Sequence, residues 1–173
     1  MFDAGDLIFH PRYGFGTISG LTRRDPLHPN QEGAGAGVSD QAQAYYDIQL
    51  MDGGGTLLVP VSRGARAGLR LLTNGIDAIT ACLHSPAQSL PADARKRAAE
   101  LGARGQNGEP TALAASVRDM LAQSRGRMLT SSEKAWLDNS CERLSTEAAL
   151  VDRISRSEAF AAIREAVTFL NVT

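Results

Sequence analysis

The sequence predicts an α+β protein, in which a small antiparallel β-sheet or partly open barrel is followed by a separate domain of four or five helices. Two observations support this class. Apolar residues alternate with a period of two in the first part of the chain and recur at helical spacing beyond residue 72. No helical pattern separates the predicted strands, which favours antiparallel pairing. We therefore predict a β domain over residues 1–72 and a helical domain over residues 73–173.

The first 24 residues predict two short strands folded back on each other. Residues 7–9 are apolar, and Pro11 ends the first strand because it has no N–H to donate. Gly14 and Gly16 in the return strand suit a tight turn or a bulge with a close backbone approach. The return strand is predicted to end at Arg24.

The next part of the chain predicts a loop and a hairpin. Residues 25–43 are rich in Pro, Gly, Ala, Gln, Asn and Ser, so we expect a mobile loop that adds little to the core. Strand patterns then cover residues 45–50 and 56–61, and a glycine-rich turn at residues 52–55 joins them.

Helical spacing dominates the rest of the chain. Pro91 suits a first helical position, where its missing N–H is not needed. Capping boxes are predicted at Thr130 with Glu133 and at Ser155 with Glu158. The predicted apolar stripes are Leu72, Ile76, Ile79 and Leu83; Leu113, Val117, Met120 and Leu121; Leu137, Cys141, Leu144, Ala148 and Val151; and Phe160, Ile163, Val167 and Leu170.

Composition excludes several classes of protein. The formal net charge is −1 over 173 residues, and no apolar run approaches the roughly 20 residues that span a bilayer. With no signal-peptide pattern at the N-terminus, we expect a cytoplasmic protein without a membrane partner. Cys82 and Cys141 are predicted to be reduced core residues. Because His, Cys and Asp do not cluster at ligand spacing, we expect no metal site.

Catalysis is not expected. The glycines at 14 and 16 precede a strand rather than a helix, and Gly53–Gly55 lacks the Lys-Ser/Thr of a P-loop. Nor do Ser, Cys, His and Asp form a nucleophilic grouping. We therefore predict no catalytic residues, no cofactor and no small-molecule substrate.

Positive charge is concentrated in residues 94–127. This segment has three acidic residues against seven basic ones, which favours either a solvated helical face or a surface that contacts phosphates. The basic residues are Arg95, Lys96, Arg97, Arg104, Arg118, Arg125 and Arg127.

Some single residues allow two interpretations. Trp136 lies in an apolar stripe, so a position in or near the core is favoured over a stacking platform. Tyr45 and Tyr46 alternate faces, which predicts that one packs and the other lies on the sheet surface. Arg23 and Arg24 end a strand, where they are either anchors for a protein partner or solvated charges.

The order of these features resembles the CarD family. Its β module also occurs as the RNA-polymerase-interacting domain of the bacterial transcription-repair coupling factor. Similar segments lie in both halves of the chain, so the resemblance covers nearly all of it. They are residues 5–18, 45–48, 58–61 and 68–70 in the β half, and residues 117–120 and 129–134 in the helical half.

The resemblance implies a Tudor-like β domain that docks on the β subunit of bacterial RNA polymerase. Arg24 corresponds to a polymerase-facing basic residue, and Leu58 falls where relatives often carry another. With them, the neighbouring Arg23 and Tyr45 complete the predicted polymerase-binding set.

The helical domain is implied to touch promoter DNA at the upstream edge of the melted bubble. The predicted contacts are Arg95, Arg118 and Lys134 at basic positions of the family pattern, with Lys96 and Arg97 beside them. Relatives place a tryptophan wedge just before the first basic helix, and Leu90 aligns with it here.

Leu90 allows two interpretations and leaves two functions open. At the mouth of a helix that starts at Pro91, Leu90 would serve as an apolar wedge that unstacks a base step, or it would simply pack onto its own helix. The protein would accordingly be a transcription regulator that engages polymerase and DNA, or an adaptor that binds polymerase or another protein without engaging DNA.

Overall fold

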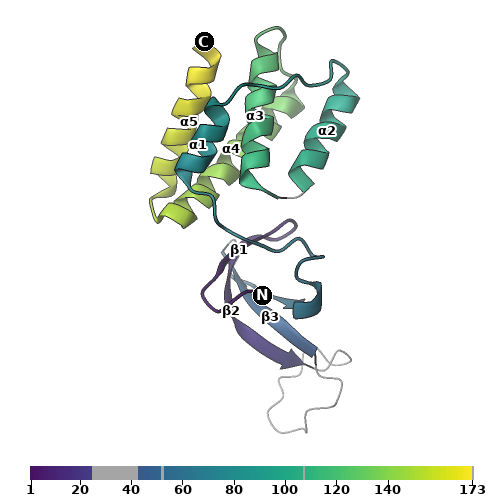
Figure 1. The fold of residues 1–173 in the computed structure, drawn as a ribbon, viewed down its shortest axis with the longest axis vertical. Helices are drawn as coiled ribbons and strands as arrows, with labels where there is room; N and C mark the ends of the chain where they lie inside the picture. Colours follow the sequence, from purple (N-terminus) through teal and green to yellow (C-terminus); the bar gives the residue numbers. More distant parts are fainter. Residues whose placement is uncertain (25–42, 52, 107, 173) are drawn as a thin grey trace. The chain divides into compact units, whose positions relative to one another are not determined.

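The computed structural model describes residues 1–24, 43–51, 53–106 and 108–172, and the chain divides into two compact units, Met1–Leu71 and Leu72–Thr173. The first unit contains a sheet and the second contains helices (Figure 1). The predicted α+β class is therefore confirmed. The loop predicted for residues 25–43 lies outside the described residues, except that Gln43 begins a strand.

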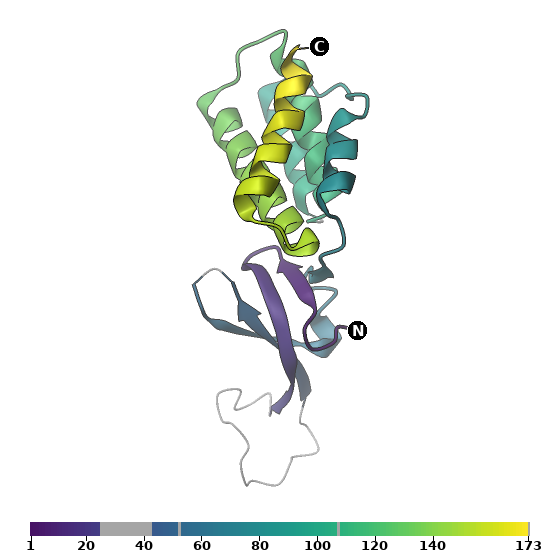
Figure 2. The same cartoon turned by 90° about the vertical axis from the view of Figure 1, so that its left-hand side faces the viewer.

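Five strands form one open antiparallel sheet in the described part of the first unit. They are β1 (Leu7–His10), β2 (Gly14–Arg24), β3 (Gln43–Leu50), β4 (Thr56–Pro60) and β5 (Arg70–Leu71). Their order is β4-β3-β2-β1-β5, so the long β2 strand lies between β1 and β3 (Figure 2). A short 3₁₀-helix, η1 (Val61–Arg63), follows β4.

The β1–β2 pair explains the glycines near the N-terminus. His10 pairs with Gly14, which places Pro11 in the turn, and Gly14 has a φ of 78° that favours glycine. A Cβ on Gly16 would lie 2.8 Å from Ile48 Cγ2 and 2.9 Å from the Gln49 carbonyl oxygen. Gly16 is therefore the predicted close approach, whereas the register shift of β2 lies further along, between Ile18 and Gly20.

One face of the sheet carries the hydrophobic core of the first unit. Side chains alternate along each strand, so Ile18 of β2 and Tyr46 and Ile48 of β3 reach this core, whereas Leu21 on the same face is exposed. Tyr46 packs into this core. Its neighbour Tyr45 lies on the opposite face and is only half-buried. The buried residues are Ile8, Ile18, Tyr46, Ile48, Val59 and Leu69.

Five helices form the described part of the second unit. They are α1 (Ile76–His84), α2 (Ala94–Gln106), α3 (Pro110–Ser124), α4 (Ser131–Asp152) and α5 (Arg156–Val172). Each of the other four helices contacts α3, which is central to the bundle (Figure 1). Among the described helices, none combines the length and apolar character that a membrane span needs.

The capping predictions are confirmed, but one helix start is wrong. The Thr130 hydroxyl accepts a hydrogen bond from the Glu133 N–H, and Ser155 and Glu158 cap each other in the same way. The helix predicted to begin at Pro91 instead begins at Ala94. Asp93 caps it, because its carboxylate accepts the Lys96 N–H at 2.9 Å.

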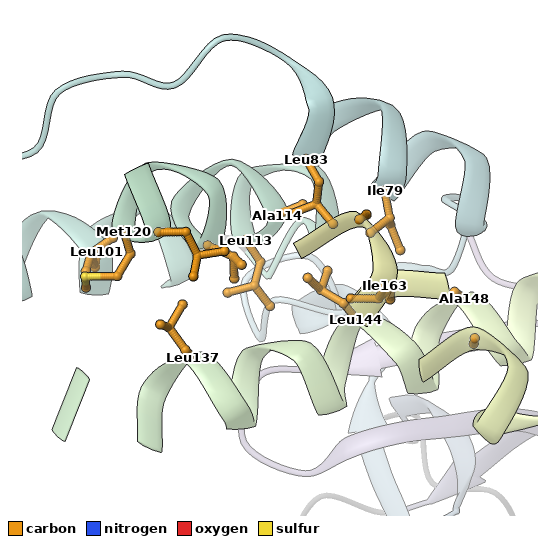
Figure 3. Packing of buried hydrophobic residues seen from close by; sticks show 14 of the residues in the cluster. Ile79, Leu83, Leu101, Leu113, Ala114, Met120, Leu137, Leu144, Ala148 and Ile163 are labelled. Atoms are coloured by element: carbon orange, nitrogen blue, oxygen red, sulfur yellow. The ribbon is translucent and has the colours of Figure 1, made fainter. Parts of the chain in front are cut away.

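The helical core brings the predicted apolar stripes together (Figure 3). The predicted stripe beginning at Leu72 starts too early, since α1 begins only at Ile76. Cys82 and Cys141 are free and half-buried, and burial raises the pKa of Cys141 to about 11. Labelled residues of the core include Ile79, Leu83, Leu113, Ala114, Met120, Leu137, Leu144, Ala148 and Ile163.

We predict that Gly16→Ala lowers the free energy of unfolding by about 2 kcal/mol, because the new methyl group would overlap the β3 backbone. Gly20→Ala is the matched control, because a Cβ at Gly20 would meet nothing within 4 Å. Urea unfolding followed by circular dichroism measures both. Equal stabilities of the two variants would contradict the close approach.

Candidate partner and nucleic-acid surfaces

Three of the four predicted polymerase-binding residues share one face of the sheet. The pairing of β2 with β3 and of β3 with β4 places Arg24, Tyr45 and Leu58 on the face opposite Tyr46. All three side chains are half-buried. Arg23 is exposed and alternates to the other face. The structure therefore separates the two adjacent arginines.

The strand that carries Leu58 is an edge of the sheet. β4 pairs with β3 on one side, and no described strand pairs with its other side. Unpaired backbone groups along such an edge are a template for a strand from another protein. Pro60 ends the strand, which limits the length available for pairing.

Most of the positive charge in residues 94–127 is neutralised within the helical unit. Four of the seven basic residues form ion pairs with Glu100, Asp119 or Glu133. These four residues are Arg97, Arg104, Arg118 and Arg127.

Asp119 of α3 is one centre of this network and is fully buried. One carboxylate oxygen accepts hydrogen bonds from Arg118 Nε at 2.8 Å and from the Gln88 N–H at 2.8 Å. The other accepts one from Arg104 Nη1 at 2.8 Å. Arg118 also donates to the Ser85 hydroxyl. Asp119 therefore ties α2 and the segment before it to α3.

Glu133, in the first turn of α4, is the second centre. Its carboxylate accepts hydrogen bonds from Arg127 at 2.6 and 2.9 Å, from Arg97 Nε at 2.9 Å and from the Thr130 N–H at 2.9 Å. The bonds from Arg127 hold the pKa of Glu133 far below its ordinary value, against the opposing effect of burial. Those from Thr130 and Arg97 lower this pKa further.

The network sorts the predicted DNA-binding residues into two groups. Arg97 and Arg118 are only 3% and 5% exposed, and their guanidinium groups bind within the helical unit. Arg95, Lys96 and Lys134 are exposed. The structure thus leaves three of the five predicted cations at the surface.

Leu90 is a core residue in this structure. Its side chain is 6% exposed and belongs to the helical core, and its carbonyl oxygen accepts a hydrogen bond from Gln123 at 3.3 Å. The helix that would have presented Leu90 starts four residues later, at Ala94. Of the two interpretations of this residue, burial by packing is the one observed, although the packing involves the whole core and not its own helix alone.

Two hollows flank the first turn of α4. A groove of about 490 Å³ between α2 and α4 is bordered by Arg95, Glu133 and the half-buried Trp136. A second hollow of about 450 Å³ is bordered by Lys134 and by residues of the α3–α4 turn. Trp136 packs against the core, as predicted.

The α3–α4 turn contains Met128, a surface residue that the sequence did not single out, close to Arg125 of the basic segment. Arg125 and Met128 are both exposed. A signal was present, because Arg125-Gly126-Arg127-Met128 lies between two helical stripes and pairs basic residues with an apolar one. This signal was missed because Arg125 and Arg127 were counted as part of one long basic segment, residues 94–127.

Comparison with known proteins covers both units. A family model described as the CarD-like/TRCF RID domain matches residues 2–71, and one described as the CarD C-terminal domain matches residues 78–164. The second alone covers half of the chain. The chain belongs to the CarD family. This family is not enzymatic. Membership of it identifies this chain as a transcription regulator that interacts with RNA polymerase.

A curated relative is similar along nearly its whole length. The Bacillus subtilis (strain 168) protein named "Putative transcription factor YdeB" is 26% identical over 163 residues. The match covers 91% of this CarD-family chain and 97% of the relative. The two proteins therefore share both the β unit and the helical unit.

We predict that Glu133→Gln lowers the free energy of unfolding by about 3 kcal/mol at pH 7, because Arg97 and Arg127 would lose a partly buried anion. The pKa of Glu133 is lowered in the folded state, so its stabilisation is complete above the ordinary value of 4.5 and is lost as the pH falls below it. The difference between variant and wild type should therefore shrink below pH 4.5.

Urea unfolding followed by the fluorescence of Trp136, the single tryptophan, measures this difference. Glu142→Gln is the control, since Glu142 forms an exposed ion pair with Arg156 and its loss should change stability by no more than about 0.5 kcal/mol. A difference between Glu133→Gln and wild type that stays constant down to pH 3 would contradict the assigned role of this carboxylate.

Proposed function

We propose that this CarD-family protein binds the β subunit of bacterial RNA polymerase through its first unit and promoter DNA, near the upstream edge of the bubble, through its helical unit. The observation that supports DNA binding is that the predicted DNA-binding cations divide into buried and exposed residues. Arg97 and Arg118 are neutralised inside, whereas Arg95, Lys96 and Lys134 are exposed. Exposed cations are the groups that contact phosphates.

The polymerase half rests on one face and one edge of the sheet. Arg24, Tyr45 and Leu58 combine a cation, an aromatic ring and an apolar side chain, a mixture typical of protein interfaces. The β4 edge beside Leu58 offers backbone groups to a partner strand. Family membership supports RNA polymerase as the partner. The choice of its β subunit follows from the resemblance to the CarD family.

The DNA contact depends on the polymerase contact. With a formal net charge of −1, the chain lacks the basic excess typical of proteins that bind DNA on their own. Docking on polymerase would raise the effective concentration of the helical unit beside the promoter. A few exposed cations then suffice, because their weak phosphate contacts form within one complex.

A second candidate function is an adaptor that binds polymerase without engaging DNA. Two observations favour it: Leu90 is buried, and the net charge is slightly negative. The two candidates differ in whether promoter DNA increases the affinity of the chain for polymerase.

For the polymerase face, we predict that Arg24→Glu weakens binding to the β subunit about tenfold, because the reversed charge would lie on the contact face. Arg23→Glu makes the same change of charge one residue away on the opposite face and should alter the affinity less than about threefold. Titration of the full chain against purified polymerase measures both. Equal losses would show that the contact face is assigned incorrectly.

For the DNA surface, we predict that Arg95→Gln combined with Lys134→Gln removes most of the affinity gained when promoter DNA is added to polymerase, and reduces the salt slope of that gain by about 2. Binding to polymerase alone should not change. Arg153→Gln is the control, because Arg153 is an exposed cation at the far end of α4. If promoter DNA adds no affinity even to the wild-type chain, the adaptor function is correct.

A further inference from the structure

The groove between α2 and α4 has an apolar lining. Its volume of about 490 Å³ falls within the range of about 300–1,000 Å³ that is typical of small-molecule sites. Leu101 and Met120, which belong to the helical core (Figure 3), line it together with the half-buried ring of Trp136. The exposed Ala94 and Ala98 of α2 line it as well. A ligand in this groove would therefore meet mainly apolar surface.

Gly102 keeps the groove open. It lies within α2, where glycine is less favourable than alanine because the helix must restrict a more flexible backbone. A Cβ at Gly102 would meet nothing within 4 Å, so no crowding requires glycine at this position. Because Gly102 lines the groove, a larger side chain there would occupy it. The effect of the glycine is to leave this space unfilled.

The charges that line the groove leave one cation uncompensated. Arg97 and Glu133 also line it, but they pair with each other, and Glu133 pairs with Arg127 as well. Arg95 is exposed and takes part in none of the ion pairs formed among the described residues of the helical unit. The groove therefore presents a positive charge beside apolar surface, which is complementary to an apolar molecule with one negative charge.

The groove offers few hydrogen-bonding groups to a ligand. The Thr130 hydroxyl is already used in the capping box with Glu133, which leaves the exposed Ser132 as the other hydroxyl of the lining. A sugar or a nucleotide would bury polar groups without partners here, and such groups are costly to bury. A hydrocarbon body has no such groups.

We propose that this groove binds a small carboxylate with a hydrocarbon body. The hydrocarbon packs against Leu101, Met120 and Trp136, and the carboxylate pairs with Arg95. Because the site lies within the helical unit, this proposal does not depend on the polymerase or DNA contacts proposed above.

The test uses the full chain with decanoate as the probe, and the fluorescence of Trp136, the single tryptophan, measures binding. Below the concentration at which decanoate forms micelles, we expect a saturable change with a Kd on the order of 0.1 mM, which is within reach of a ligand of this size. Decanol has the same hydrocarbon chain without the charge. It should bind about tenfold more weakly, because it has no anion to pair with Arg95.

Two pairs of variants locate the site. Gly102→Leu should abolish saturable binding by filling the groove, whereas Ala99→Leu, on α2 but outside the lining, should leave the Kd unchanged. Arg95→Gln should weaken decanoate binding about tenfold, to the level of decanol. Lys96→Gln removes the adjacent exposed cation, which does not line the groove, and should preserve the preference for decanoate.

The opposite results overturn the proposal. Full decanoate binding by Gly102→Leu would show that the ligand lies elsewhere. Equal affinities of the wild-type chain for decanoate and decanol, or an unchanged preference in Arg95→Gln, would overturn the pairing of the carboxylate with Arg95. A fluorescence change that appears only once decanoate forms micelles would overturn the site altogether.

Discussion

The fully buried Asp119 and the partly buried Glu133 determine how the helical unit displays its charge. Asp119 binds Arg104 and Arg118, and Glu133 binds Arg97 and Arg127. Burying a guanidinium without a counter-ion costs several kcal/mol, so Arg97 and Arg118 are stabilised in the interior by these carboxylates. Arg104 and Arg127 are only half-buried. The bonds also connect α2, α3 and α4, which fixes the orientation of the surface cations on α2 and α4.

This arrangement gives the basic segment two roles. Buried arginines act as structural links, and the exposed cations remain for a ligand. In a chain of net charge −1, such a division would, under the proposed function, limit binding to free DNA while keeping a basic face for DNA that polymerase brings close. Under the proposed function, the protein would act where polymerase has already selected a promoter.

Local features of the fold could be predicted from the sequence because their causes are local. Strand alternation, the capping box at Thr130 and the helical stripes each depend on residues within a few positions. The start of α2 was mispredicted because Pro91 and Asp93 both suit a helix N-terminus. In the structure Asp93 caps the helix, and the Pro91 carbonyl oxygen accepts side-chain hydrogen bonds from Arg97 and from Gln123 of α3.

The candidate site was harder to predict, because two of its ion pairs, Arg97 with Glu133 and Arg104 with Asp119, join residues that lie far apart in the chain. Arg97 and Glu133 are 36 residues apart, and nothing in the local pattern joins them. One signal was available: Arg97, Leu101 and Arg104 recur at helical spacing, which places both arginines on the same face of the helix as an apolar residue. Arg95 and Lys96 fall outside this stripe and are exposed.

The central claim is that the helical unit contacts promoter DNA once the β unit has docked on polymerase. Hydroxyl-radical footprinting of a polymerase–promoter complex, with and without the chain, tests it most directly. The account predicts added protection of the backbone at the upstream edge of the bubble. An unchanged DNA footprint while the chain remains bound to polymerase would contradict it.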